Sequence, residues 1–341
     1  MDLSKSDRYI SEEEAYGKYR HFLCDDGDFV IASSGIKVEY IDKKMGFVDA
    51  SMLPLCMNTS TIRFKVLDEN QLRIRYFMYY LKSKHFKEQL TKQITGSAQL
   101  NYGPSHLKKM IMPLIDITVQ DEIISCMDKL QSIIETRQRE LIELDRLMKA
   151  RFVELFGDPR SNPFGFEKKR LKDTCKVITG NTPSRAIEEY YGDYIEWIKT
   201  DNIVSGILNP TQATESLSEK GMNVGRTVEK DSILMACIAG SIASIGRVCI
   251  TDRTVAFNQQ INAVVPEQYN ILFLYVLFQM SKDYLVEDIN MALKGILSKS
   301  KLEEKEFIIP PMDLQEQFSD FVKQVNKSKF DTMTFAPIYA I

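Results

Sequence analysis

Short polar and basic side chains gather in two segments of the second half of the chain, and their types suit contacts with nucleic acid. One is the turn sequence Gly180-Asn-Thr-Pro-Ser184, followed directly by Arg185, and the other is Lys199-Thr-Asp-Asn202. Arg and Lys pair with guanine or hold phosphates, Asn and Gln pair with adenine, and Ser and Thr serve both. Because the same residue types also close ordinary turns, a DNA contact and a purely structural turn remain equally open.

Catalytic and metal-binding patterns are weak throughout the sequence. It has no Walker-type phosphate loop, no dinucleotide-binding glycine pattern and no HExxH motif. The six cysteines are scattered without a CxxC pair, so we expect small buried side chains rather than a disulfide framework or a zinc site. We interpret Glu196 and Lys199 as an exposed charged pair beside a buried Trp197. We therefore expect no catalytic residue and no metal site.

The composition is that of an ordinary globular protein. Hydrophobic residues make up 44% of the 341 residues, charged residues 27% and aromatic residues 10%, which excludes disordered, collagen-like and disulfide-scaffold chains. The longest apolar run, residues 271–278, is too short to span a membrane, and the first residues do not resemble a signal peptide. We expect about two domains in a cytoplasmic protein without a membrane partner.

The net charge is −3, whereas a free-standing DNA-binding domain is usually strongly basic. Basic residues are nevertheless concentrated locally: residues 59–110 contain ten basic and three acidic residues, and residues 166–185 contain six and two. These stretches suit a protein that binds DNA alongside other subunits, and they equally suit solvated faces. Charge alone favours the solvated faces.

A long helix is the strongest local signal. Residues 120–156 contain no Gly or Pro, and their apolar residues recur at alternating spacings of four and three, which is typical of a coiled coil. Gly157-Asp-Pro159 ends the helix. A helix of this length cannot bury its own seam and needs a partner helix. Because a second, shorter helix near the end of the chain follows the seam only to about residue 330, we expect another chain, a partner subunit or a second copy, to cover the seam. The expected seam residues are Ile123, Met127, Leu130, Ile134, Leu141, Leu144, Met148 and Leu155.

The sequence also contains an internal repeat of nearly 200 residues. Gln120 aligns with Gln315 at an offset of 195, and residues 77–81 align with residues 273–277. The second copy has about 65 residues, 166–229, where the first has only some 26, so the first lacks the turn and the Trp197 segment. We interpret the chain as a duplication clipped at both ends. The shared offset places three further seam residues on the second helix: Phe318, Val322 and Val325.

Short β-branched and aromatic runs alternate with helical segments in both copies, which predicts α+β domains. Strands are expected over residues 29–32, 61–66, 232–236, 247–251 and 261–265, and helices over residues 75–90 and 271–289.

The chain resembles the specificity (S) subunits of type I restriction-modification enzymes over about residues 10–330. The resemblance is carried by the 180–184 turn, the Ile195-Glu-Trp-Ile-Lys199 run and segments 231–236, 245–248 and 258–261. Its most specific part is Ile309-Pro-Pro-Met-Asp-Leu-Gln315-Glu-Gln-Phe318, similar to the family's Pro-Pro-Leu-x-x-Gln-x-x-Ile opening of a spacer helix. The other copy, residues 115–123, replaces both prolines.

The resemblance implies an α+β fold with two target-recognition domains, the first incomplete, separated by a long coiled-coil-like spacer helix. The implied boundaries are 1–112 for the partial first domain, 113–158 for the spacer helix, 159–308 for the second domain, and 309–341 for a truncated second spacer helix and tail. The chain would read a bipartite DNA site without catalytic groups. Methyltransferase subunits would supply S-adenosylmethionine, and restriction subunits would supply ATP- and Mg²⁺-dependent cleavage.

The expected DNA contacts are polar and basic side chains beside the matched motifs. In the second domain they are Thr182, Ser184, Arg185, Lys199, Asp201, Asn202 and Ser241, and in the first they are Ser33, Ser34, Lys37, Lys92 and Gln99. We expect the chain that covers the seam to be a methyltransferase subunit, or a second copy in a homodimer through the spacer helix. The alternatives are a truncated or silent specificity cassette, a coiled-coil adaptor that does not bind DNA, and a stand-alone methyltransferase or nuclease with an unrecognised site.

Overall fold

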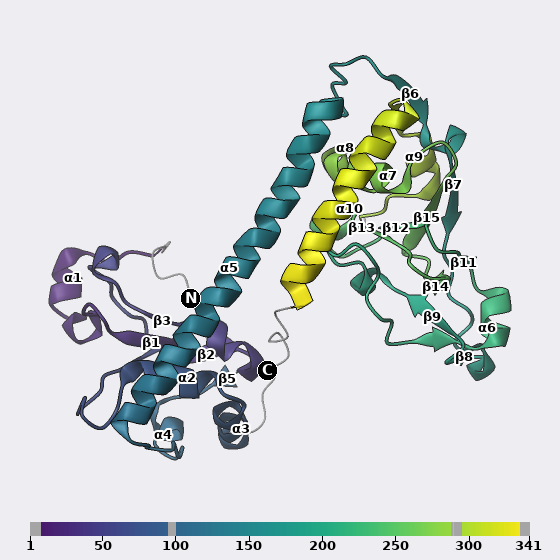
Figure 1. Ribbon diagram of the computed structural model, residues 1–341. Helices are drawn as coiled ribbons and strands as arrows, with labels where there is room; N and C mark the ends of the chain where they lie inside the picture. Colours follow the sequence, from purple (N-terminus) through teal and green to yellow (C-terminus); the bar gives the residue numbers. More distant parts are fainter. Residues whose placement is uncertain (1–7, 95–99, 288, 290–294, 335–341) are drawn as a thin grey trace. The chain divides into compact units, whose positions relative to one another are not determined.

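The computed structural model describes residues 8–94, 100–287, 289 and 295–334 (Figure 1). The chain divides into two compact units whose boundary falls inside one helix, with residues up to 136 in the first unit and residues 137–337 in the second. That helix, α5 (Ile117–Phe156), has 40 residues and contributes one half to each unit. The predicted α+β class and the long helix are therefore confirmed.

The first unit is built on a three-stranded antiparallel sheet in the order β3-β1-β4, beside a separate pair of β2 and β5. Strand β1 is the central strand of this sheet. Its three consecutive apolar residues, 29–31, are all buried, as in a strand that is covered on both faces. Helices α2 and α3 cover the sheet with Phe86 and Leu90 in the shared core. The elements are α1 (Glu12–Tyr16), β1 (Phe29–Ala32), β2 (Ser34–Ile36), β3 (Met45–Phe47), β4 (Thr61–Phe64), α2 (Ile74–Lys82), α3 (Lys84–Gln93), β5 (Leu100–Asn101) and α4 (Pro104–Leu107).

The second unit contains three sheets. A four-stranded antiparallel sheet has the order β13-β12-β15-β7, a mixed sheet has the order β11-β14-β9-β10-β8, and β6 pairs with β16. The strands are β6 (Glu167–Arg170), β7 (Cys175–Thr179), β8 (Tyr191–Gly192), β9 (Ile195–Ile198), β10 (Ser216–Leu217), β11 (Thr227–Val228), β12 (Ile233–Ala236), β13 (Val248–Ile250), β14 (Val255–Phe257), β15 (Ile261–Pro266) and β16 (Glu306–Ile309). The helices are α6 (Glu219–Val224), α7 (Ile271–Met280), α8 (Lys282–Val286), α9 (Lys299–Glu304) and α10 (Met312–Thr334).

Within the second unit, α10 runs antiparallel beside the second half of α5 (Figure 1). Four buried phenylalanines join these helices to α7: Phe152 contacts Phe156, Phe273 and Phe318, with ring centroids 5.0, 5.7 and 5.5 Å apart. Further along, the buried Lys329 ammonium of α10 pairs with Asp145 of α5. The interface is therefore aromatic at one end and contains an ion pair toward the other.

The structure reproduces the internal repeat at its two glutamines, which begin α5 and α10 and are fully buried. Gln120 accepts a hydrogen bond from Arg73 N at 2.9 Å and donates to Ile115 O at 2.9 Å. Gln315 accepts from Asn270 N at 2.9 Å and donates to Pro310 O at 2.8 Å. Each amide thus fastens the first turn of its helix to the N-cap residue of an earlier helix, α2 for Gln120 and α7 for Gln315.

The sheets explain why the two copies differ in length. Strand β1 lies between two antiparallel neighbours, as β12 does, so the small sheet of the first unit matches part of the four-stranded sheet. Strands β7 to β11 come from the extra residues 166–229 of the second copy. Among the described residues of the first unit there is no counterpart of the five-stranded sheet.

The predicted seam residues differ in how far they are covered. Met148 of α5 is buried with Phe318, Val322 and Val325 of α10, and Leu144 and Leu155 pack against the same core. Ile123, Leu130, Ile134 and Leu141 are half-buried, whereas Met127 is 39% exposed. Coverage of the remaining seam by another chain stays a prediction. In the described part of the chain, no helix combines the length and hydropathy required to cross a lipid bilayer.

Candidate nucleic-acid interface

The turn after β7 is fixed by contacts that its sequence makes possible. Gly180 is required because a Cβ there would lie 2.2 Å from the carbonyl oxygen of Asn258. The Asn181 amide donates to Val224 O at 2.9 Å and accepts from Arg226 N at 2.8 Å. Thr182 Oγ1 donates to Gln259 Oε1. The turn is therefore rigidly held, while Thr182, Ser184 and Arg185 remain exposed.

A cluster of cations and aromatic rings lies next to this turn. The Arg185 guanidinium is 4.3 Å from the Tyr191 ring centroid and 5.1 Å from the Trp197 ring, and Lys199 Nζ is 5.2 Å from the Trp197 ring. Both cations pair with the carboxylate of Glu215. Hydrogen bonds from Lys199 and Arg185 hold the pKa of Glu215 below its usual range, so the cluster contains two positive charges and one negative charge at neutral pH.

The segment after β9 exposes fewer groups than its sequence indicates. Asn202 is only 7% exposed, because its amide accepts from Lys199 N at 3.0 Å and donates to Gln212 O at 3.1 Å. The Asn202 side chain therefore lies in the interior of the second unit and does not face the surface at which a base would be contacted. Asp201 is exposed.

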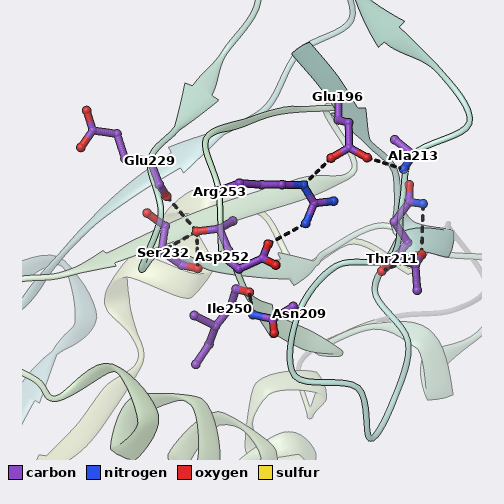
Figure 2. Close-up of polar contacts among 11 residues, drawn as sticks. Glu196, Asn209, Thr211, Ala213, Glu229, Ser232, Ile250, Asp252 and Arg253 are labelled. Carbon is purple, nitrogen blue, oxygen red and sulfur yellow. Dashed lines mark hydrogen bonds and ion pairs between the residues drawn. The ribbon is translucent and has the colours of Figure 1, made fainter. Parts of the chain in front are cut away.

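The loop that follows is pinned by the network in Figure 2. The Glu196 carboxylate accepts from Arg253 Nε and from Ala213 N, the latter at 2.9 Å, while Asn209 donates to Ile250 O at 2.8 Å. Burial raises the pKa of Glu196, but the hydrogen bonds from Arg253 and Ala213 outweigh it and leave the pKa below its usual range. The interpretation of Glu196 and Lys199 as one exposed pair is thus wrong. Each is half-buried and pairs with a different residue.

Arg247 connects a third polar turn to this surface. It donates to Ser244 O at 3.2 Å and to Thr200 O at 3.3 Å, so the turn containing the exposed Ser241 lies beside the turn after β9. Glu215 joins the Arg185 turn to Lys199 in the same way. Three loops separated in sequence therefore lie side by side on the second unit. We call them, with Glu215 and Gln259, the polar-turn surface (residues 180–185, 199–202, 215, 241–247 and 259).

The candidate residues of the first unit are more scattered. Ser33 is 6% exposed, and its backbone bonds to Ser60 and Tyr102 place it in the interior. Ser34 begins β2, and the exposed Lys37 and Lys92 lie before a short 3₁₀-helix and in the last turn of α3. Gln99 lies outside the described residues.

Three residues of the polar-turn surface were missed by sequence reasoning: Glu215, Arg247 and Gln259. Gln259 lies in the Asn258-Gln-Gln segment, so its amide could have been recognised as a base-pairing group. Arg247 follows Gly246, within a segment already noted. Glu215 gave no signal, since an isolated acidic residue in a loop is most often solvated.

The cysteines only partly follow the prediction that they are small buried side chains. Cys24, Cys175, Cys237 and Cys249 are buried, but Cys56 is half-buried and Cys126 of α5 is exposed. Among the residues that the structure describes, no group of three or more His, Cys, Asp or Glu is arranged to hold a metal ion.

The fold and the surface together define a duplicated α+β protein with a long connecting helix and a surface of polar turns on its second unit. A family model described as "Type I restriction modification DNA specificity domain" matches residues 3–146 and 163–337. The chain belongs to this family.

Relatives and solved structures agree with the family. The chain is 33% identical to the specificity subunit of the type I restriction enzyme HindI from Haemophilus influenzae over 146 residues, which cover 41% of this chain and 31% of that protein. It is 24% identical to the MjaIX specificity subunit from Methanocaldococcus jannaschii over 302 residues, 82% of this chain and 68% of that one. The match to the Haemophilus protein thus spans about a third of its length.

The fold is similar to that of a type I restriction-modification S subunit from M. genitalium, with a TM-score of 0.56 and 14% identity, covering 92% of this chain and 79% of that one. A chain from a structural study of assembly and conformational transition in the type I R-M system gives a TM-score of 0.55 and 15% identity, covering 92% and 78%. At these identities the likeness concerns the fold.

Proposed function

We propose that the chain is a DNA sequence-recognition subunit that reads a bipartite site, with one half-site contacted by each module. The observation that carries the proposal is the duplication: one family model matches both copies, and each copy begins its helix at a buried glutamine. Two modules connected through a helix suit a sequence with two specified halves and an unspecified gap. The chain supplies contacts to DNA and no catalytic group.

The second module offers both kinds of contact that a DNA reader needs. Arg185 and Lys199 are placed to hold phosphates, which set affinity and register. Thr182, Ser184 and Gln259 carry the exposed hydroxyl and amide groups that can read base edges.

Methyltransferase and restriction subunits complete the proposed complex, and S-adenosylmethionine, ATP and Mg²⁺ bind to those subunits. A groove of about 600 Å³ on the second unit supports docking of a partner helix. Its lining combines apolar and charged side chains: Glu140, Glu143, Leu144, Arg146, Leu147 and Ala150 of α5, and Thr332 of α10. Leu147 is 51% exposed, a large apolar side chain whose burial a partner would favour. A second copy of this chain is the alternative occupant.

A salt-titrated gel shift tests the DNA contact directly. Affinity for duplex should fall by at least about tenfold between roughly 50 and 200 mM salt if the basic side chains displace counterions from phosphates. Binding that is absent or insensitive to salt, even with the methyltransferase subunit present, would contradict the proposal and favour an adaptor that does not bind DNA.

Mapping of methylated adenines tests the bipartite site. A host that contains the methyltransferase subunit should gain one interrupted methylation motif when this chain is expressed, and lose it when the chain is omitted. A chain that folds and binds DNA but directs no methylation would indicate a silent cassette. Binding of S-adenosylmethionine by this chain alone, measured by equilibrium dialysis, would instead indicate an enzyme.

A further inference from the structure

Glu215 is the one carboxylate within the described polar-turn surface that touches both of its aromatic-stacked cations. Its Oε2 pairs with Arg185 at 2.5 Å and its Oε1 pairs with Lys199, while its backbone carbonyl accepts from Trp197 N at 3.0 Å. The Glu215 side chain is 35% exposed, so its carboxylate is accessible from solvent. Its two oxygens are therefore occupied by the groups that would bind an anion from outside.

The two cations are held in place by more than this carboxylate. Arg185 lies over the rings of Tyr191 and Trp197. Lys199, which directly follows β9, also lies over the Trp197 ring. Tyr191 is itself tied to the turn through its hydroxyl, which donates to Pro183 O at 2.6 Å. Removal of the Glu215 charge should thus leave the guanidinium and ammonium groups close to their present positions.

The spacing of these donors suits a phosphate. An Arg fork and a Lys ammonium that converge on one pair of oxygens can bind phosphate oxygens with the same charge-assisted hydrogen bonds. Lys199 is 27% exposed and Arg185 is 55% exposed, so a DNA backbone could reach both.

We infer that Arg185 and Lys199 form a binding site for one DNA backbone phosphate, and that Glu215 occupies this site in the free protein as an internal counter-anion. The inference rests on the proposed function in DNA recognition. A duplex must displace the carboxylate before it can use these cations, so Glu215 weakens binding to every sequence by a similar amount. A duplex that also makes base contacts still binds despite this loss, whereas a duplex without them binds too weakly, and Glu215 thereby limits non-specific binding.

The test compares the affinity of the whole chain and its Glu215→Gln variant for a fluorescent duplex of about 30 base pairs and arbitrary sequence, across roughly 50–300 mM KCl. Glu215→Gln keeps the size of the side chain but removes its charge and replaces one of its two acceptor oxygens by an NH₂ donor. We expect the affinity of Glu215→Gln for the duplex to be about three- to tenfold higher at the lowest salt concentration. The difference should shrink as salt increases and screens the charges. Thermal unfolding measured alongside shows that both proteins are folded.

A matched control lies on the same unit, where Glu189 pairs with Lys220 and both side chains are about 70% exposed. Glu189→Gln removes an equal charge that pairs with neither Arg185 nor Lys199, and it should leave the affinity within about twofold, because exposed charges are screened by salt. A similar gain from this variant would mean that net charge alone is responsible, and the inference would be wrong.

The combined variant Glu215→Gln with Arg185→Ala and Lys199→Ala identifies the groups that carry the gain. The gain should disappear, and Arg185→Ala or Lys199→Ala alone should weaken binding of the otherwise unchanged chain. If Glu215→Gln binds no more tightly than the unchanged chain, or its gain persists without the two cations, the inference fails while the proposed function stands. If neither the unchanged chain nor Glu215→Gln binds duplex at low salt, even with the methyltransferase subunit present, the proposed function fails as well.

Discussion

The buried amides of Gln120 and Gln315 form hydrogen bonds with main-chain N–H and C=O groups near helix starts, which would otherwise be buried without a partner. Both are at most 1% exposed, and each bonds to main-chain atoms from two different segments. No other side chain has a counterpart in both copies with the same pattern among the hydrogen bonds described above. This makes the glutamine a determinant of how each module holds its helix.

Replacement of Gln315 by Ala should therefore destabilise the second unit by about 2–4 kcal/mol, because the Asn270 N–H and the Pro310 carbonyl lose their partner. Urea unfolding followed by circular dichroism measures the change. Gln324→Ala, on the exposed side of the same helix, should change stability by less than about 0.5 kcal/mol. Equal effects of the two substitutions would show that the buried amide has no special role.

Thiol reactivity offers a second prediction for single residues. Burial raises the pKa of Cys175, Cys237 and Cys249 to about 12, so almost none of these thiols is ionised at pH 8. Cys126 is exposed on α5 and should react first with a thiol reagent such as DTNB, with Cys56 more slowly. Cys126→Ser should abolish the fastest phase. Survival of that phase would contradict the position given to Cys126.

The polar turns could be located from residue types, but not which of their side chains face solvent. Asn181 and Asn202 are of the type that reads adenine, yet both amides are used inside the fold. Their partners, Val224 and Gln212, come from other parts of the unit, so no local pattern could identify them. Glu215 was missed for the same reason, because its importance depends on Arg185 and Lys199 converging on it.

Among the helices, α5 shows how one element can have two differently covered faces. Phe152 is fully buried and contacts three other phenylalanine rings, whereas its neighbour Val153 is 45% exposed. The heptad pattern predicted the existence and end of this helix well, because its periodicity is sustained and Gly157 and Pro159 stop it. The pattern did not predict which seam residues are buried and which are exposed, since their burial depends on contacts with α10 and the second module.

Phe152→Ala should destabilise the second unit by about 3–5 kcal/mol, because it removes a ring from the core joining α5, α7 and α10. Val153→Ala, at the exposed neighbouring position of the helix, should cost less than about 0.5 kcal/mol. Chemical denaturation of both variants provides the measurement. If the two substitutions were equivalent, the aromatic core would not be what holds α5 in the second unit.

At the scale of the whole chain, the sequence repeat predicted two modules but not their different architectures. The first unit lacks, among its described residues, the five-stranded sheet that carries Trp197 and its cation cluster in the second. A repeat in sequence shows only what the copies share. The extra sheet depends on pairings such as the parallel contact of β14 with β9, which join residues about 60 positions apart and leave no trace in local periodicity.

The proposed division into two readers makes α5 the determinant of the gap between half-sites. Insertion of seven residues between Thr136 and Arg137, where the two units meet, would preserve the heptad phase and lengthen the helix by about 10 Å. At roughly 3.4 Å per base pair, the gap in the methylation motif should grow by about three base pairs while both half-sites stay the same. Methylation mapping with the methyltransferase subunit present measures it, and a three-residue insertion, which breaks the phase, serves as the comparison. An unchanged gap, or altered half-site sequences after the seven-residue insertion, would show that α5 does not set the distance.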